Sequence, residues 1–153
     1  MATKTCQNKI ESYHTLRYAV PAAAKVAKTP QELKDMCDAL LNLNIKFAEN
    51  NVYSYYTLQY IIPAAAKAAR NADELEIFIN LTIKYAENKI YLSDTLEDII
   101  PAIAKTTKTD QELKDICDTL FNLSVIAKNK GIDSRSFYSL IVQSLEATGK
   151  TQV

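Results

Sequence analysis

The stretch that decides the fold reads Leu16-Arg-Tyr-Ala-Val-Pro-Ala-Ala-Ala-Lys25, and the chain repeats it twice with small changes. The second copy begins at Leu58 and the third at Leu96. Each copy is followed by a helix-capping signal and a second apolar segment that contains Asn-Leu. A period of about 40 residues is typical of stacked helical hairpins, in which each hairpin covers the apolar face of the next.

The composition agrees with an all-α protein. The chain has 153 residues, 48% of them hydrophobic, with only 2 glycines and 4 prolines, which suits one helical domain with few flexible turns. We divide this domain, residues 1–153, into repeats at about 12–50, 51–88 and 89–129 and a partial repeat at 130–148. The 18 basic and 18 acidic residues cancel, so the net charge favours neither a nucleic acid nor a membrane as partner.

Each repeat divides into a first helix, helix A, and a second helix, helix B. In helix A, the apolar residues Ala19, Val20 and Ala23 share one face, while Arg17 and Lys25 lie on the other. Each helix A also contains a proline, which removes one backbone hydrogen bond. Two geometries remain open: a continuous helix kinked at the proline, or two short helices that meet there.

Helix B begins at a capping box, Thr29 to Glu32, which recurs as Asn71 to Glu74 and Thr109 to Glu112. It should end near Asn50, Asn88 and Asn129, because asparagine tolerates the left-handed conformation that follows many helices, and Gly131 could take that role in the last copy. The second helix B lacks four residues, which is about one helical turn. We predict helices at about 12–28, 31–49, 54–70, 73–87, 93–107, 111–128 and 134–147.

The repeats resemble armadillo repeats and, more loosely, HEAT repeats over residues 12–147. The resemblance is carried by Val20-Pro-Ala22, Ile62-Pro-Ala64 and Ile100-Pro-Ala102, each followed by an Asn-Leu pair. It implies a right-handed α-solenoid of three armadillo/HEAT-like hairpins plus a terminal helix. It also implies that asparagines on helix B bind the backbone of an extended peptide. The glycine that armadillo repeats place before Ile-Pro is absent, which favours the two-helix, HEAT-like form.

A polar row on helix B is the first candidate site. We predict that it binds an extended or helical segment of a partner protein, as a non-catalytic adaptor. The alternative is a solvated face whose charges complement the helix dipoles. The residues of this row are Asp38, Asn42, Lys46, Glu76, Asn80, Lys84, Asp118 and Asn122.

A basic row at the end of helix A is the second candidate. Cations spaced along successive helices could bind a polyanion such as nucleic acid, or they could only offset the helix dipole. The residues of this row are Lys25, Lys28, Lys67, Arg70, Lys105 and Lys108. Self-assembly is a third alternative, because Leu140, Ile141 and Leu145 lie on a last helix that has no helix B.

Several residue types are more simply explained by structure than by chemistry. The cysteines Cys6, Cys37 and Cys117 form no Cys-x-x-Cys pair, so we expect free thiols in the cytoplasm, with Cys37 and Cys117 in the core. The only histidine, His14, has no second imidazole to complete a site. We therefore predict no catalytic residue, no metal, no cofactor and no membrane span. Tyrosines at the repeat entries should pack between repeats, with an interface as the alternative: Tyr13, Tyr18, Tyr53, Tyr55, Tyr56, Tyr60 and Tyr91.

Overall fold

Every regular element is helical in the part of the chain that the computed structural model describes, which is residues 15–90 and 94–132 and, near the end, 136, 137, 139–141, 143, 144 and 147. The all-α prediction is therefore confirmed for these residues. The observed helices begin and end within three residues of the predicted ones wherever the ends are described. Predictions for Cys6, Tyr13, His14, Tyr91 and Leu145 lie outside the described residues or side chains.

Helix A runs through its proline without a break. In the first repeat it consists of η1 (Thr15–Ala19) and α2 (Val20–Val26), and in the second of η2 (Thr57–Ile61) and α4 (Ile62–Ala68). The Ile62 N–H donates to the Thr57 carbonyl five residues back, a π-type bond placed just before Pro63. A wider turn of this kind makes room for a proline ring that would otherwise clash with the preceding turn.

In the third repeat Pro101 lies inside one helix, α6 (Asp94–Thr106). Of the two geometries left open by the sequence, the continuous helix is therefore the one observed in all three repeats.

Helix B is the longer element of each repeat and forms α3 (Pro30–Glu49), α5 (Ala72–Glu87) and α7 (Asp110–Asn129). The predicted capping residues accept the expected bonds, for example Glu32 N–H to Thr29 Oγ1 at 3.1 Å and Glu74 N–H to Asn71 Oδ1 at 2.9 Å. The second hydrogen bond differs from that of the usual capping box, in which the glutamate side chain accepts from the backbone N–H of the capping residue. Here the glutamate accepts from the backbone N–H of the residue before it. Lys28 N–H donates to Glu32 Oε2 at 2.7 Å, and repeats 2 and 3 do the same.

The ends of helix B correct one prediction. The left-handed residues are Asn51, Lys89 and Gly131, with φ of 58°, 56° and 71°. Asn50 and Asn88 come one residue earlier, and each side-chain amide donates to a carbonyl of its own last turn. Gly131 takes the role proposed for it, and Lys130, not Asn129, therefore occupies the place of Asn50 and Asn88.

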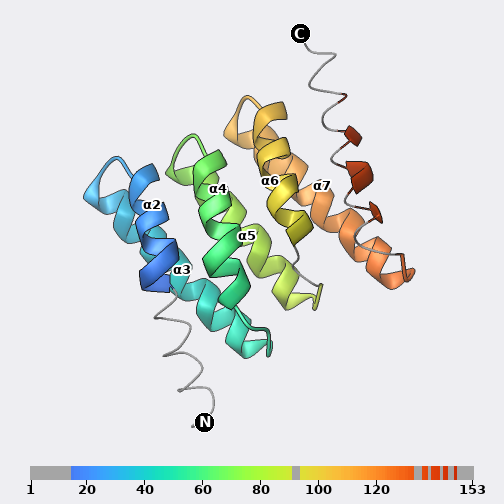
Figure 1. The fold of residues 1–153 in the computed structure, drawn as a ribbon, viewed down its shortest axis with the longest axis horizontal. Coiled ribbons are helices and arrows are strands. Elements are labelled where there is room, and N and C mark those ends of the chain that lie inside the picture. Colours follow the sequence, from blue (N-terminus) through green and yellow to red (C-terminus); the bar gives the residue numbers. More distant parts are fainter. Residues whose placement is uncertain are drawn as a thin grey trace.

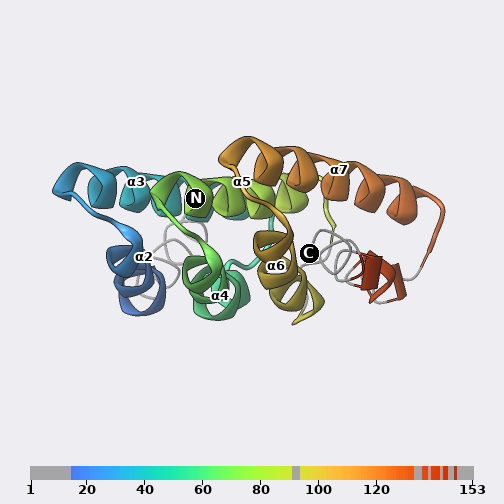
Figure 2. The ribbon, with the colours of Figure 1, turned by 90° about the horizontal axis from the view of Figure 1, so that it is seen from above.

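Two layers of helices enclose the core. Figure 1 shows α2, α4 and α6 side by side in chain order, and Figure 2 shows α3, α5 and α7 as a second layer over them. Fully buried side chains from both layers, such as Ala23, Leu43, Ile61 and Phe78, form one continuous apolar cluster. The helix B of repeat 2 has 16 residues against 20 in the others, so the missing turn shortens α5 without changing which face it buries.

Candidate functional site

The polar row predicted from the sequence lies on the outer side of α3, α5 and α7, and we call this surface the B face. Leu40 and Leu43 are buried in the core. Helical spacing therefore places Asn42 on the opposite side of α3, which faces away from the core. Asn80 and Asn122 hold the same place on α5 and α7, and all three asparagines are exposed. Because α3 packs against α5 and α5 against α7, the three amides follow one another across neighbouring helices.

The three asparagine side chains make no hydrogen bond within the described part of the chain. This sets them apart from Asn44, Asn50 and Asn71, whose side chains bond to Ser54, to the Lys46 carbonyl and to Glu74 N–H. Each amide of the B face therefore has a donor and an acceptor available for a ligand.

The charged members of the row are mostly paired. Lys84 Nζ contacts Asp118 Oδ1 at 3.0 Å and joins α5 to α7, while Asp38 pairs with Lys34 at 3.0 Å on its own helix. Lys46 lies 3.8 Å from Glu49. These are exposed pairs, which stabilise a protein by only about 0.2–1 kcal/mol each, so a ligand could replace them at little cost.

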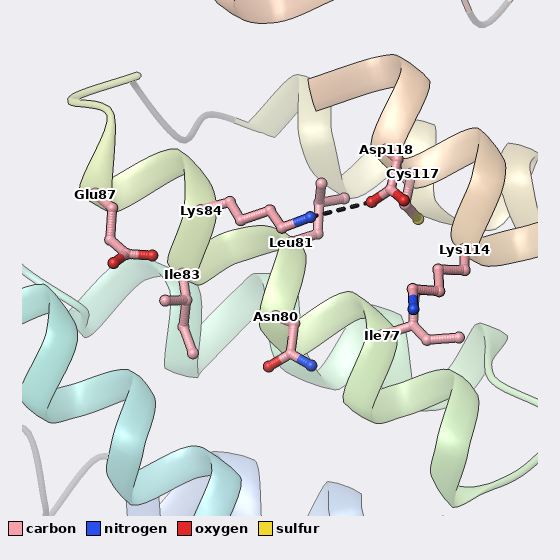
Figure 3. A pocket seen from close by; sticks show the side chains of 9 residues that line it. All are labelled: Ile77, Asn80, Leu81, Ile83, Lys84, Glu87, Lys114, Cys117 and Asp118. Atoms are coloured by element: carbon pink, nitrogen blue, oxygen red, sulfur yellow. Dashed lines mark hydrogen bonds and ion pairs between the residues drawn. The ribbon is translucent and has the colours of Figure 1, made fainter. Parts of the chain in front are cut away.

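A pocket of about 340 Å³ opens on the B face between α5 and α7 (Figure 3). Asn80 and the Lys84–Asp118 pair supply polar lining, and Ile77 and Cys117 supply apolar lining. Cys117 is buried, as predicted, whereas Cys37 is only half-buried. Burial raises the pKa of the Cys117 thiol to about 12, so this group stays protonated and apolar near neutral pH.

The B face also has apolar members that the sequence pattern did not predict. Leu41 and Ile45 flank Asn42 and are 47% and 48% exposed. They belong to an apolar run that is typical of a core, but no described helix B precedes α3 to cover them, whereas the equivalent Ile79 and Ile83 on α5 are buried.

The basic row lies at the ends of the A helices, and its six residues are all exposed. Two grooves separate these helices, one of about 580 Å³ between α2 and α4 and one of about 480 Å³ between α4 and α6. Alanine and proline form much of their lining, with Lys25, Lys67 and Lys105 alongside. In the described ranges these three lysines have no ion pair.

Arg70 differs from the rest of the basic row. Its Nη2 lies 2.7 Å from Glu74 Oε2, and its Nη1 donates to the Thr107 carbonyl of the next repeat at 2.6 Å. The guanidinium therefore already has a structural role, which leaves five cations for a ligand.

The tyrosines correct another prediction. Tyr53, Tyr55 and Tyr60 are exposed and do not fill the space between repeats. Tyr56 is half-buried, its ring centroid lies 5.0 Å from that of Tyr60 with the rings tilted, and its hydroxyl donates to Glu97 of the next repeat. Among the contacts of the described residues, the bond from Tyr56 to Glu97 therefore links repeat 2 to repeat 3.

Comparisons with protein-family models, with curated proteins and with solved structures found no match for this chain. Within the described ranges, no three His, Cys, Asp or Glu side chains come together as metal ligands would. None of the described helices is both long enough and apolar enough to cross a membrane. The function is therefore inferred from the geometry of the chain itself.

Proposed function

We propose that the chain is a small right-handed α-solenoid of the armadillo/HEAT type that works as a non-catalytic, cytoplasmic adaptor. Its B face binds an extended or helical segment of a partner protein. The observation that carries this proposal is the row of Asn42, Asn80 and Asn122, exposed on neighbouring helices with no hydrogen bond inside the described chain.

The chemistry of the row suits a polypeptide. An asparagine amide can donate to a backbone carbonyl and accept from a backbone N–H at the same time. Neighbouring helices pack about 8–10 Å apart, so each amide could reach a different peptide group of a segment lying across the helices. The exposed Leu41 and Ile45 and the pocket beside Asn80 would accept apolar side chains of the same segment.

The double variant Asn80→Ala with Asn122→Ala tests the proposal. Ligands would be short peptides selected from a random library on the wild-type protein. Loss of hydrogen bonds at two positions, at about 1 kcal/mol each, should weaken binding roughly 30-fold. The measurement is titration calorimetry, with the melting temperature followed by circular dichroism.

The control is Gln31→Ala with Gln111→Ala, which removes two exposed amides at the starts of α3 and α7 and should leave affinity unchanged. If the asparagine variant binds the selected peptides normally, the proposal is wrong. Equal losses of binding and thermal stability would indicate a structural asparagine ladder.

The unpaired lysines favour one second candidate, the binding of a polyanion such as nucleic acid along the A helices. A labelled DNA duplex, followed by fluorescence anisotropy, should then bind at about 50 mM salt and weaken steeply as salt rises. The triple variant Lys25→Gln, Lys67→Gln, Lys105→Gln should lower the slope of log affinity against log salt by about 3. The same change at Lys114 and Lys130, which lie on and after α7, is the control and should leave the slope unchanged. Absence of binding at about 50 mM salt would exclude this candidate.

A further inference from the structure

Corresponding leucines on the three B helices differ in exposure. Leu43 on α3 and Leu81 on α5 are 0% and 3% exposed, but Leu123 on α7 is 38% exposed. The three positions point along the layer toward the next helix B. That helix is α5 for Leu43 and α7 for Leu81, whereas no helix B follows α7 among the described residues. Leu43 and Leu81 are therefore each covered by the next helix B of the same chain, and Leu123 is not.

The last repeat also carries an apolar residue where the others are charged. Ile126 is 49% exposed and occupies the position of Lys46 and Lys84. Repeat arrays that stay monomeric usually end in a polar face. Here the side of α7 that no described helix B follows carries the exposed apolar residues Leu123 and Ile126 instead.

The described parts of the last segment continue the other layer. Phe137 and Ile141 pack against the core, while Leu140 is 63% exposed. Figure 2 shows these parts beyond α6 and below α7. The described residues of this segment thus extend the layer of A helices beyond α6, whereas no helix B beyond α7 is among them, so the described part of the molecule ends in a step.

We propose that two copies of the chain associate through this step as a two-fold symmetric dimer. A rotation that exchanges the two layers would bring the described residues of the last segment of each copy beside α7 of the other, on the side where no described helix B follows α7. Leu140 of one copy would then cover Leu123 and Ile126 of the second, and the reverse. The step is complementary to itself, since one chain supplies both the exposed Leu140 and the α7 surface that receives it, as a two-fold interface requires. The contact continues the packing of α3 on α5 and of α5 on α7.

Light scattering coupled to size exclusion tests the dimer over about 1–100 µM protein. The wild-type chain of 17.1 kDa should elute with twice that mass. Ile126→Lys restores the lysine that the first two repeats have at this position and should raise the dissociation constant at least about tenfold. Leu140→Lys changes the other half of the contact and should act in the same way. Both sites are exposed, and circular dichroism should show unchanged helix content.

Ile45→Lys is the matched control, because Ile45 is an equally exposed isoleucine at the opposite end of the helix B layer. It should leave the dimer intact. A monomer at every concentration would overturn the proposal. So would equal dissociation by Ile45→Lys, which would indicate head-to-tail contacts instead. The asparagine variants of the B face should not change the mass, so this proposal and the proposed function can fail separately.

Discussion

Replacing Tyr85 by alanine is expected to lower the free energy of unfolding by about 3–5 kcal/mol, the cost of deleting a large buried ring. Tyr85 is fully buried on α5 and its ring lies 5.7 Å from that of Phe121 on α7. Its hydroxyl is 2.8 Å from Ser124 Oγ, also on α7. The side chain therefore joins repeat 2 to repeat 3, and its loss should weaken the contact between them.

Tyr85→Phe is the control for the ring. It removes only the hydroxyl, and Ser124 keeps its own bond to the Leu120 carbonyl at 2.8 Å, so the loss should be about 1 kcal/mol. Urea unfolding followed by circular dichroism measures both variants. Because α7 packs mainly against α5 and α6, Tyr85→Ala should also broaden the transition as repeat 3 separates from the rest. Equal losses in the two variants would show that the hydroxyl, not ring packing, holds the repeats together.

Replacing Arg70 by alanine should cost about 2–4 kcal/mol at pH 7, somewhat less than the usual cost of breaking a buried ion pair because Arg70 is partly exposed. Its side chain is 41% exposed, but that of Glu74 is only 1% exposed. The variant would leave a buried carboxylate without its guanidinium and would remove the bond to the Thr107 carbonyl. Lys108→Ala is the matched control, because Lys108 holds the same place in repeat 3 without an ion pair in the described chain. Its effect should be within about 0.5 kcal/mol.

The effect of Arg70→Ala should depend on pH. Burial disfavours the charge on Glu74, but hydrogen bonds from the side chain and backbone of Arg70 outweigh it and hold the pKa of Glu74 below its usual value. A carboxylate with a lowered pKa contributes stability above its unfolded pKa of about 4.3, and this is lost as pH falls through the folded pKa. The difference between wild type and Arg70→Ala should therefore be largest at neutral pH and smallest near pH 3. Urea unfolding at both values checks this, and a difference independent of pH would contradict the ion pair as its cause.

Local features were predictable because the residues that cause them are close in sequence. The capping residues Thr29, Asn71 and Thr109 set where helix B begins, and the helical period set which side of it is buried. The exposed asparagines followed from the same period. The left-handed residue was misplaced by one, because Asn50 and Asn88 bond to the helix end instead of turning the chain.

Features that depend on neighbouring repeats could not be read from one repeat. Lys28, Arg70 and Lys108 hold equivalent positions in the three repeats. Of these three, the side chain of Arg70 forms an ion pair with the glutamate four residues later. Its guanidinium also donates to the Thr107 carbonyl of the next repeat. The exposed Ile126 could have been found from the repeat alignment, since it replaces a lysine. The exposed fractions of Ile126 and Leu123 could not be found in that way, because they depend on which helices lie beside α7.

The sequence by itself determined the helices, their caps and the faces they bury, because hydrogen bonds and side-chain spacing within a few turns decide these. Only the tertiary structure decided which equivalent side chains are covered and which stay open. Leu43, Leu81 and Leu123 have the same local sequence role, but burial depends on whether another helix follows in space. That is a property of how the helices pack in space and not of the local sequence.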